Sequence, residues 1–186
     1  MKKIVFTFGI IAGFINIMTD ILLTNLGGEE MMHSNTQWIG YLVMVIALSL
    51  IFVGVKQYRD KHLGGVIKFG KAFLIGLYIS LVAGAIYVGT WEVYLHTTDL
   101  NFMETYSTSV IESMKADGAS AAEISEMEEQ MKYYTEMYEN PISRMLITLS
   151  EILPVGLIIS LISAALLRKS TFMPDEENID TEATAT

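Results

Sequence analysis

The chain has 186 residues, of which 52% are hydrophobic and 18% are charged, and its formal net charge at pH 7 is −9. This apolar content is too high for an ordinary soluble domain, and the charges are segregated between apolar stretches, as in membrane proteins. The negative charge argues against nucleic-acid binding, because phosphates are recognised by clusters of Lys and Arg. The absence of cysteine excludes disulfides, thiolate catalysis and cysteine-ligated metals.

Four apolar stretches cover approximately residues 4–24, 36–55, 72–95 and 145–167. Each is about as long as the ~20 residues that a helix needs to cross a bilayer. Because a backbone in hydrocarbon must satisfy its own hydrogen bonds, these spans are predicted to be helices. The first stretch is longer than the apolar part of a signal peptide and lacks a clear cleavage site, so we interpret it as a retained anchor. The sequence therefore predicts an all-α integral membrane four-helix bundle over residues 1–170.

Basic residues are distributed unevenly around these stretches. They precede the first, lie between the second and third, and follow the fourth: Lys2, Lys3, Lys56, Arg59, Lys61, Lys68, Lys71, Arg168 and Lys169. By contrast, residues 97–141 carry ten acids and two bases. The positive-inside rule then predicts that both termini lie in the cytoplasm and that residues 97–141 lie outside.

Residues 97–141 are predicted to form a helical hairpin. The first helix covers about residues 100–115 and ends near Gly118, where glycine can adopt the left-handed cap. Ser120 and Glu123 have the spacing of a capping box and begin a second helix, which ends before Asn140-Pro141. Its apolar residues recur three and four positions apart and form one face: Ile124, Met127, Met131, Tyr134 and Tyr138. This face either packs within the hairpin and on the bundle or binds an extracytoplasmic protein partner.

Small residues recur at helical spacing in three of the stretches, which favours close helix packing. Together with polar residues they form one face per helix: Gly9, Gly13, Asn16 and Asp20 in the first stretch; Ala72, Gly76, Ser80 and Gly84 in the third; Gly156, Ser160 and Ala164 in the fourth. A second face of the third helix holds Ala85, Gly89 and Glu92. A helix with two such faces is either central or touches a second copy, so a homodimer is one alternative.

Asp20, Glu92 and Glu151 are acidic residues within or near the spans, where a charge is costly and usually faces protein or water. One interpretation is a carboxylate site for a proton or small cation, centred on Glu151. A kink at Pro154 would change the direction of Glu151 relative to the small face of the helix. The other is a pair between Glu151 and Arg144, seven residues earlier in the same helix, with Asp20 and Glu92 in water at the membrane interface.

No catalytic, cofactor or metal motif is recognised, so we predict neither an enzyme nor a cofactor. Thioethers bind Cu(I), and a copper hypothesis would use Met31, Met32, His33, Met103, Met114, Met127, Met131 and Met137. Their spacing is mostly that of a helix face, and His33, His62 and His96 are too scattered for one site, so no metal site is predicted.

Two further predictions concern segments on the predicted cytoplasmic side. The basic residues of the segment 56–71 either bind anionic lipid headgroups or only determine topology. Residues 171–186 are acidic and rich in Thr and Ala, and are predicted to be a disordered tail.

Several short motifs resemble a known family. They are Asp99 with Phe102 and Tyr106; Gly118-Ala119-Ser120 with Glu123; Met137-Tyr138 and Asn140-Pro141; and Glu151-Ile152-Leu153-Pro154-Val155-Gly156 followed by Ser160-Leu161 and Ala164. Over about residues 2–169 the chain resembles domain of unknown function 4199, a family of small bacterial membrane proteins. Thr98 stands where the family pattern often has proline. The resemblance implies a four-helix inner-membrane protein, supplies no activity, and draws attention to Glu151 and Pro154.

Two functions are consistent with these patterns. The first is a non-enzymatic membrane protein that acts by packing or by binding an extracytoplasmic partner. The alternative is a component of proton- or cation-coupled transport that uses Glu151, although no convincing inverted repeat, common among transporters, is present.

Overall fold

A computed structural model describes residues 1–31, 37–98 and 101–174 of the chain. In these ranges the protein is helical apart from short connections. The helices are α1 (Lys2–Met31), α2 (Gln37–Leu48), α3 (Leu50–Leu63), α4 (Phe69–Thr97), α5 (Phe102–Ala116), α6 (Ala121–Glu139) and α7 (Pro141–Leu167). The all-α prediction is confirmed for this part of the chain.

Four stretches are long and apolar enough to cross a membrane: Lys2–Leu23, Trp38–Leu63, Phe69–Thr97 and Pro141–Leu167. The second comprises α2 and α3, which are interrupted only at Ser49, whose hydroxyl donates to the Ile46 carbonyl over 2.5 Å. It continues beyond the predicted end at residue 55 until Gly64, whose φ of +61° ends the helix in the left-handed region. Large apolar side chains are exposed around these helices, for example Phe6, Leu42 and Ile158, as expected for a surface in contact with lipid.

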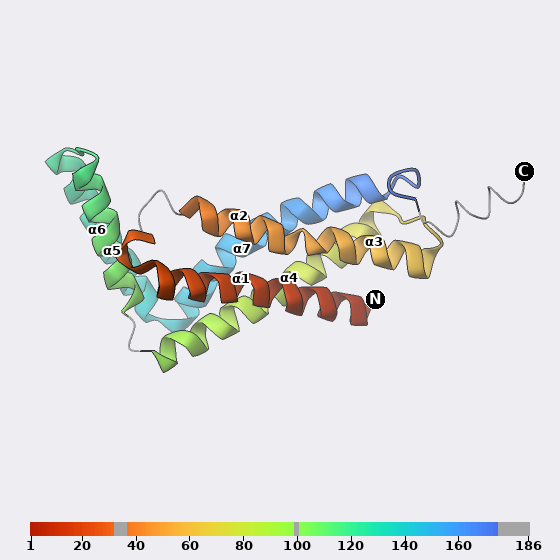
Figure 1. Cartoon of the computed structure of the whole chain (residues 1–186), viewed down its shortest axis with the longest axis horizontal. Helices are drawn as coiled ribbons and strands as arrows, with labels where there is room; N and C mark the ends of the chain where they lie inside the picture. Colours follow the sequence, from red (N-terminus) through yellow and green to blue (C-terminus); the bar gives the residue numbers. More distant parts are fainter. Residues whose placement is uncertain (32–36, 99–100, 175–186) are drawn as a thin grey trace, which may run out of the picture.

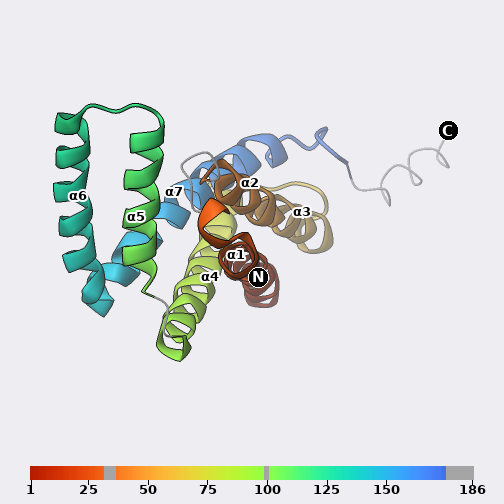
Figure 2. The ribbon, with the colours of Figure 1, turned by 60° about the vertical axis from the view of Figure 1, so that its left-hand side comes forward.

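The apolar helices lie side by side along the long axis, while α5 and α6 form a hairpin at one end (Figures 1 and 2). The N-terminus, the α3–α4 connection and the last turn of α7 lie at the opposite end (Figure 1). We call these two ends of the bundle the hairpin end and the loop end.

The contact between α4 and α7 depends on small residues from both helices. A Cβ atom added to Gly76 would lie 2.7 Å from Ser160 Oγ, and one added to Gly156 would lie 2.6 Å from Ser80 Oγ. Both serine hydroxyls bond to carbonyls of their own helices, Ser80 to Gly76 and Ser160 to Gly156. Gly84 faces Leu149 in the same contact. The backbones of the two helices can therefore approach closely.

A second face of α4 packs against α1, so α4 is central in the bundle. A Cβ atom on Gly9 would lie 2.6 Å from Val82 Cβ, and one on Gly13 would lie 2.7 Å from the Ala83 carbonyl. At Gly89, by contrast, an added Cβ would meet nothing within 4 Å. The small face of α1 thus packs on larger residues of α4, among them Val82 and Ile86, and the position of Gly89 is open.

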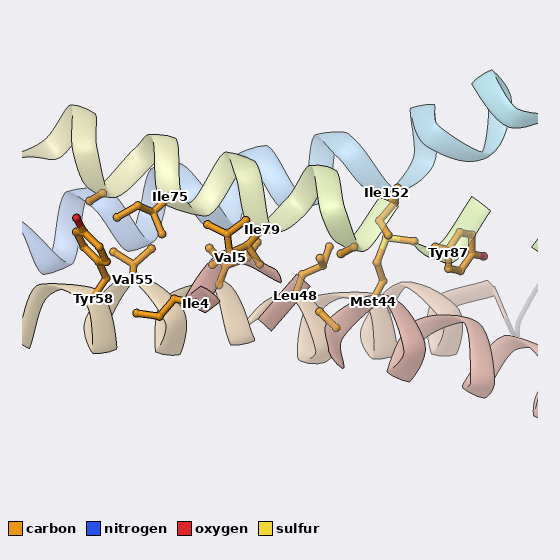
Figure 3. Close-up of a cluster of buried hydrophobic side chains, with 14 of the residues drawn as sticks. Ile4, Val5, Met44, Leu48, Val55, Tyr58, Ile75, Ile79, Tyr87 and Ile152 are labelled. Atoms are coloured by element: carbon orange, nitrogen blue, oxygen red, sulfur yellow. The ribbon is translucent and has the colours of Figure 1, made fainter. Parts of the chain in front are cut away.

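Apolar side chains fill the middle of the bundle (Figure 3). Leu48, Ile51, Ile75, Ile79 and Ile152 are fully buried there. They come from α2, α3, α4 and α7, so each of these helices contributes one apolar stripe to a common core. This core separates the polar groups at the hairpin end from those at the loop end.

Local capping interactions shape the hairpin as predicted. Ser120 Oγ accepts a hydrogen bond from the Glu123 amide, and the Glu123 carboxylate accepts one from the Ser120 amide over 2.8 Å. Hydrogen bonds from the Ser120 hydroxyl and amide lower the pKa of Glu123. Gly118 has a φ of +80° in the preceding turn. Asn140 then caps α7, accepting from the amides of residues 142 and 143.

Replacing Ser120 by alanine is expected to destabilise the first turn of α6 by about 1 kcal/mol, because an amide of that turn loses its acceptor. Amide hydrogen exchange should therefore be faster at Glu123 and its neighbours. Ser125→Ala is the matched control, since Ser125 is exposed within the same helix. Equal exchange in both variants would show that the capping box contributes little.

Candidate functional site

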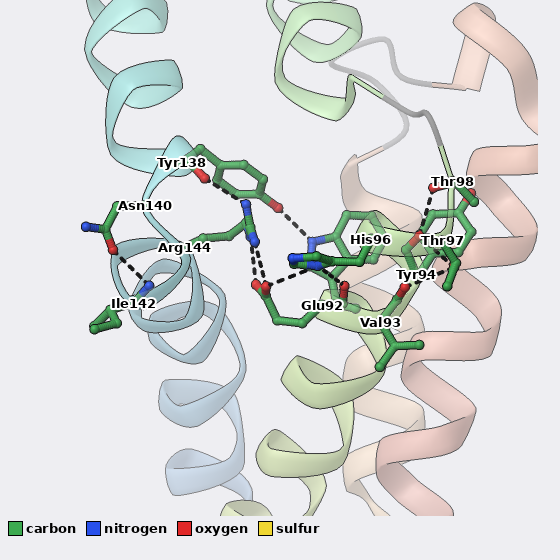
Figure 4. Close-up of polar contacts among 11 residues, drawn as sticks. Glu92, Val93, Tyr94, His96, Thr97, Thr98, Tyr138, Asn140, Ile142 and Arg144 are labelled. Carbon is green, nitrogen blue, oxygen red and sulfur yellow. Dashed lines mark hydrogen bonds and ion pairs between the residues drawn. The ribbon is translucent and has the colours of Figure 1, made fainter.

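Glu92 of α4 and Arg144 of α7 form an ion pair between helices at the hairpin end (Figure 4). Arg144 Nε donates to Glu92 Oε1 over 2.7 Å and Nη2 donates to Oε2 over 2.5 Å, a bidentate arrangement. Only 12% of the Arg144 side chain and 10% of the Glu92 side chain are exposed. The expected pair between Arg144 and Glu151 is therefore wrong, as is the expectation that Glu92 lies in water. Arg144 reaches across to the neighbouring helix instead of along its own.

Tyr138, near the end of α6, connects the hairpin to this ion pair. Its carbonyl accepts from Arg144 Nη1 over 3.0 Å, and its hydroxyl accepts from Trp91 Nε1 over 2.7 Å. Its ring lies 5.8 Å from that of Phe102, which meets Trp91 edge to face at 5.1 Å. Burial raises the pKa of Tyr138 to about 12, so the phenol remains protonated at neutral pH. These contacts hold the base of the hairpin on the bundle.

Asp20 connects α1 to α4 at the same end. Its carboxylate accepts a hydrogen bond from the Tyr87 hydroxyl over 2.6 Å. Five residues further along α1, Asn25 Nδ2 donates to the Tyr94 hydroxyl over 2.9 Å. Asp20 is half-buried and hydrogen-bonded to protein, so the expectation that it simply lies in water is also wrong.

A cleft of about 650 Å³ lies between the hairpin and this end of the bundle. It is lined by residues of α1, α2, α4, α5, α6 and α7, among them six aromatic side chains: Tyr41, Trp91, Phe102, Tyr106, Tyr134 and Tyr138. Met44, Met103 and Met131 add thioethers, so the apolar face of α6 contributes to the cleft. The charged residues in this lining are Asp20 and Glu151. Its volume and mixed lining are typical of a small-molecule site.

Glu151 is the unusual member of the lining. It lies ten residues after Pro141 on α7, roughly 15 Å along the helix. Within the described ranges no hydrogen-bond donor or base pairs with it, and the charge that acts on it is the like charge of Asp20. Pro154 lies in the next turn, and α7 remains helical across it. In a helix that crosses a membrane, an unpaired carboxylate this far from the helix end is costly until a proton or cation neutralises it.

The four polar residues selected from the sequence thus separate into two groups. Glu92 and Arg144 neutralise each other and hold helices together, whereas Asp20 and Glu151 line the cleft. The aromatic lining was not predicted as a site, because its residues are distributed over four helices. The sequence placed Tyr134 and Tyr138 only on the apolar face of the hairpin. Helical periodicity alone could identify their faces but not bring those faces together.

At the loop end, Arg59 is a structural residue that the sequence did not distinguish from its basic neighbours. It is completely buried. Its guanidinium donates to Asp60 Oδ1 over 2.6 Å and to the backbone carbonyls of Phe172 and Met173. Residues 171–174, expected to belong to a disordered tail, are therefore placed against α3, while residues 175–186 of that tail lie outside the described ranges. Arg59 is not available to lipid headgroups, in contrast to the exposed lysine Lys61.

The described methionines of the copper hypothesis lie on α1, α5 and α6. No group of three or more His, Asp or Glu side chains that could hold a metal occurs in the described part of the chain. Met103 and Met131 reach the cleft, but Met114, Met127 and Met137 are absent from its lining. Met32 and His33 lie outside the described residues.

The motifs that suggested a family meet at the cleft: Phe102, Tyr106, Tyr138 and Glu151 all line it. Asp99, from the first of these motifs, lies outside the described residues. No curated protein and no solved structure matches the chain. A family model does match residues 7–169. The chain therefore belongs to the family described as "Protein of unknown function (DUF4199)".

Proposed function

We propose that this protein is a non-enzymatic, multi-pass protein of the bacterial inner membrane that binds a ligand in the cleft at its hairpin end. The observation that carries the proposal is the cleft itself, whose walls come from the apolar bundle and from the hairpin together. Small-molecule sites commonly form between packed elements, with apolar walls and a few polar groups that orient the ligand. The ion pair between Glu92 and Arg144 keeps one side of this cleft in place.

The proposed orientation places the cleft on the extracytoplasmic side and both termini in the cytoplasm. Support comes from the separation of charge along the fold. The N-terminus and the α3–α4 connection lie at the loop end (Figure 1) and carry Lys2, Lys3 and Lys68. The hairpin at the opposite end belongs to the segment with ten acids and two bases. A ligand would then enter from outside the cell or from the outer leaflet.

A homodimer and an extracytoplasmic protein partner are further proposals that ligand binding does not require. The open position at Gly89 on α4 is where a second copy would approach. The exposed face of the hairpin is where a protein partner would approach.

The second candidate is proton- or cation-coupled transport, which the unpaired Glu151 favours. Beyond Glu151 toward the loop end, however, the described core is filled by buried Ile152, Ile79 and Ile75. Ligand binding from one side needs no path through this core, so we favour it. Under our proposal, ion-dependent flux in proteoliposomes is the same for the wild-type protein and Glu151→Gln. Loss of flux in that variant would instead support transport.

The cleft and its orientation can be tested by cysteine labelling, because the natural chain contains no cysteine. Met44 lines the cleft, whereas Val45, the next residue of α2, is exposed on the bundle surface and absent from the lining. A small, membrane-impermeant trimethylammonium methanethiosulfonate reagent added to intact cells should modify Met44→Cys and leave Val45→Cys unmodified. The two positions have nearly the same depth, so depth alone cannot produce this difference.

Two further cysteine variants serve as controls for orientation. Asp117→Cys, at the hairpin tip, should react in intact cells, and Lys61→Cys, at the loop end, should react only after the cells are opened. If Lys61→Cys reacts from outside and Met44→Cys does not, the proposed orientation is wrong. If Asp117→Cys reacts and Met44→Cys stays unmodified, the cleft is not open to external solution and the proposed function fails.

A further inference from the structure

The geometry points to a small organic cation, an amine or quaternary ammonium carrying an apolar group, as the ligand of this cleft. This inference rests on the proposed function, because it names the chemical class of the molecule that the same cleft receives. It depends on three features of the lining: two carboxylates, the absence of an opposing base in the described part, and a wall of aromatic rings.

The carboxylates come from helices that are distant in sequence but adjacent in space. Asp20 of α1 receives one hydrogen bond from the described residues, donated by the Tyr87 hydroxyl to Oδ2, so none of them occupies Oδ1. Glu151 of α7 receives none within the described ranges, and the two like charges act on each other. A cation held between two carboxylates relieves both their mutual repulsion and the cost of an unpaired charge near lipid.

No basic side chain of the described residues can neutralise these carboxylates within the cleft. The lining contains no Lys, Arg or His in the ranges that the structure describes. Arg144 is close in the fold, but both arms of its guanidinium fork are bonded to Glu92, and its remaining nitrogen donates to the Tyr138 carbonyl. The ion pair therefore removes the base that would otherwise compete with a cationic ligand.

The remaining walls select an organic cation over a metal ion. Aromatic faces attract ammonium groups through their quadrupoles, and Tyr41, Trp91 and Tyr134 line this space. Calcium and magnesium require six or more oxygen ligands, whereas most of this lining is aromatic, aliphatic or thioether. A cleft of about 650 Å³ also has room for a molecule much larger than a single ion.

Tryptophan fluorescence offers a direct test. The chain contains two tryptophans: Trp91 lines the cleft, and Trp38 is exposed and absent from the lining. In the full-length Trp38→Phe protein in mixed lipid–detergent micelles, which add no tryptophan, Trp91 is therefore a single reporter inside the site. Titration with 2-phenylethylammonium should give a saturable change in emission. The neutral analogue 2-phenylethanol should bind at least about tenfold more weakly, since it lacks the charge-assisted contacts.

Charge-neutralising variants identify the groups responsible. In the same background, Asp20→Asn and Glu151→Gln should each weaken binding of 2-phenylethylammonium by about tenfold or more. Glu129→Gln, which removes an exposed carboxylate of the hairpin, is the matched control and should leave binding unchanged. Glu151→Gln breaks no ion pair, so it should retain the thermal stability of the parent. Tyr41→Leu tests the aromatic wall without changing any charge and should also weaken binding.

The possible failures are distinguishable. Equal saturable binding of 2-phenylethylammonium and 2-phenylethanol, unaffected by Glu151→Gln, would retain a ligand-binding cleft but overturn the cationic ligand. A saturable response to Cu(I), with none to the amine, would also overturn the cationic ligand and would show instead that the methionines bind a metal. The inference of a cationic ligand is also overturned if the Met44→Cys variant reacts from outside but the protein gives no response to 2-phenylethylammonium. If that variant does not react, the proposed function fails as well.

Discussion

Replacing Arg144 by alanine is expected to destabilise the protein by about 3–5 kcal/mol, because the largely buried Glu92 carboxylate loses its arginine partner. The basic side chain that stays near it is His96, with Nδ1 4.0 Å from Glu92 Oε2. Both oxygens of Glu92 lose their donors, and the Tyr138 carbonyl loses its bond from Nη1. The hairpin should therefore loosen along with the contact between α4 and α7. The free energy of unfolding, measured by denaturant titration in mixed micelles with helical circular dichroism as the signal, checks this expectation.

Three further variants separate the ion pair from a general effect of charge removal. Lys132→Ala removes an exposed base from α6 and should change stability by no more than about 0.5 kcal/mol. Arg144→Lys keeps the charge but loses the bidentate fork, so its effect should be intermediate. The double variant Glu92→Gln with Arg144→Met should recover much of the loss, since no unpaired charge remains. A loss for Arg144→Ala no larger than that for Lys132→Ala would contradict a stabilising ion pair.

Opposite effects are expected from the same Gly→Ala change at two positions in the apolar helices. Gly156→Ala should destabilise the protein by about 1–3 kcal/mol, because overpacking forces helices apart. Its new Cβ would lie 2.6 Å from Ser80 Oγ and 2.7 Å from Ser80 Cβ. The Cβ of Ser80 is attached directly to the α4 backbone and cannot rotate away. Gly89→Ala meets nothing within 4 Å, so the higher helix propensity of alanine should stabilise it by up to about 1 kcal/mol.

A compensating variant tests the mechanism of this packing effect. Ser80→Gly removes the two atoms, Oγ and Cβ, that lie closest to the new Cβ, so Gly156→Ala should cost less in that background than in the wild type. The four unfolding free energies of this double-mutant cycle measure the coupling between the two positions. Additive effects would show that α4 and α7 are not in the close contact described above.

Features that depend on neighbouring residues in the chain were predictable. Helix type and length follow from four apolar stretches, and α6 begins at the predicted capping box, where Ser120 and Glu123 exchange hydrogen bonds. Such elements depend on interactions within three or four residues, so the sequence contains all the participants. The small faces of the helices were predictable for the same reason.

Features that depend on distant partners were not. Periodicity placed Gly76 and Gly156 on packing faces but did not state that they face Ser160 and Ser80. The sequence suggested Glu151 as the partner of Arg144, whereas the fold supplies Glu92, which is 52 residues away. The long Arg side chain can reach several acids, and only the relative position of α4 and α7 selects one of them.

By itself the sequence determined the all-α class, the apolar stretches long enough to cross a membrane, and the caps of the hairpin, because each of these depends on local periodicity and local hydrogen bonding. Only the tertiary structure decided which acids are neutralised and which remain available. It bonds Glu92 to Arg144 and Arg59 to the carbonyls of Phe172 and Met173, and it leaves Asp20 and Glu151 along an aromatic cleft. The physical reason is that burial and pairing depend on which helices pack together, and those contacts connect residues far apart in the chain.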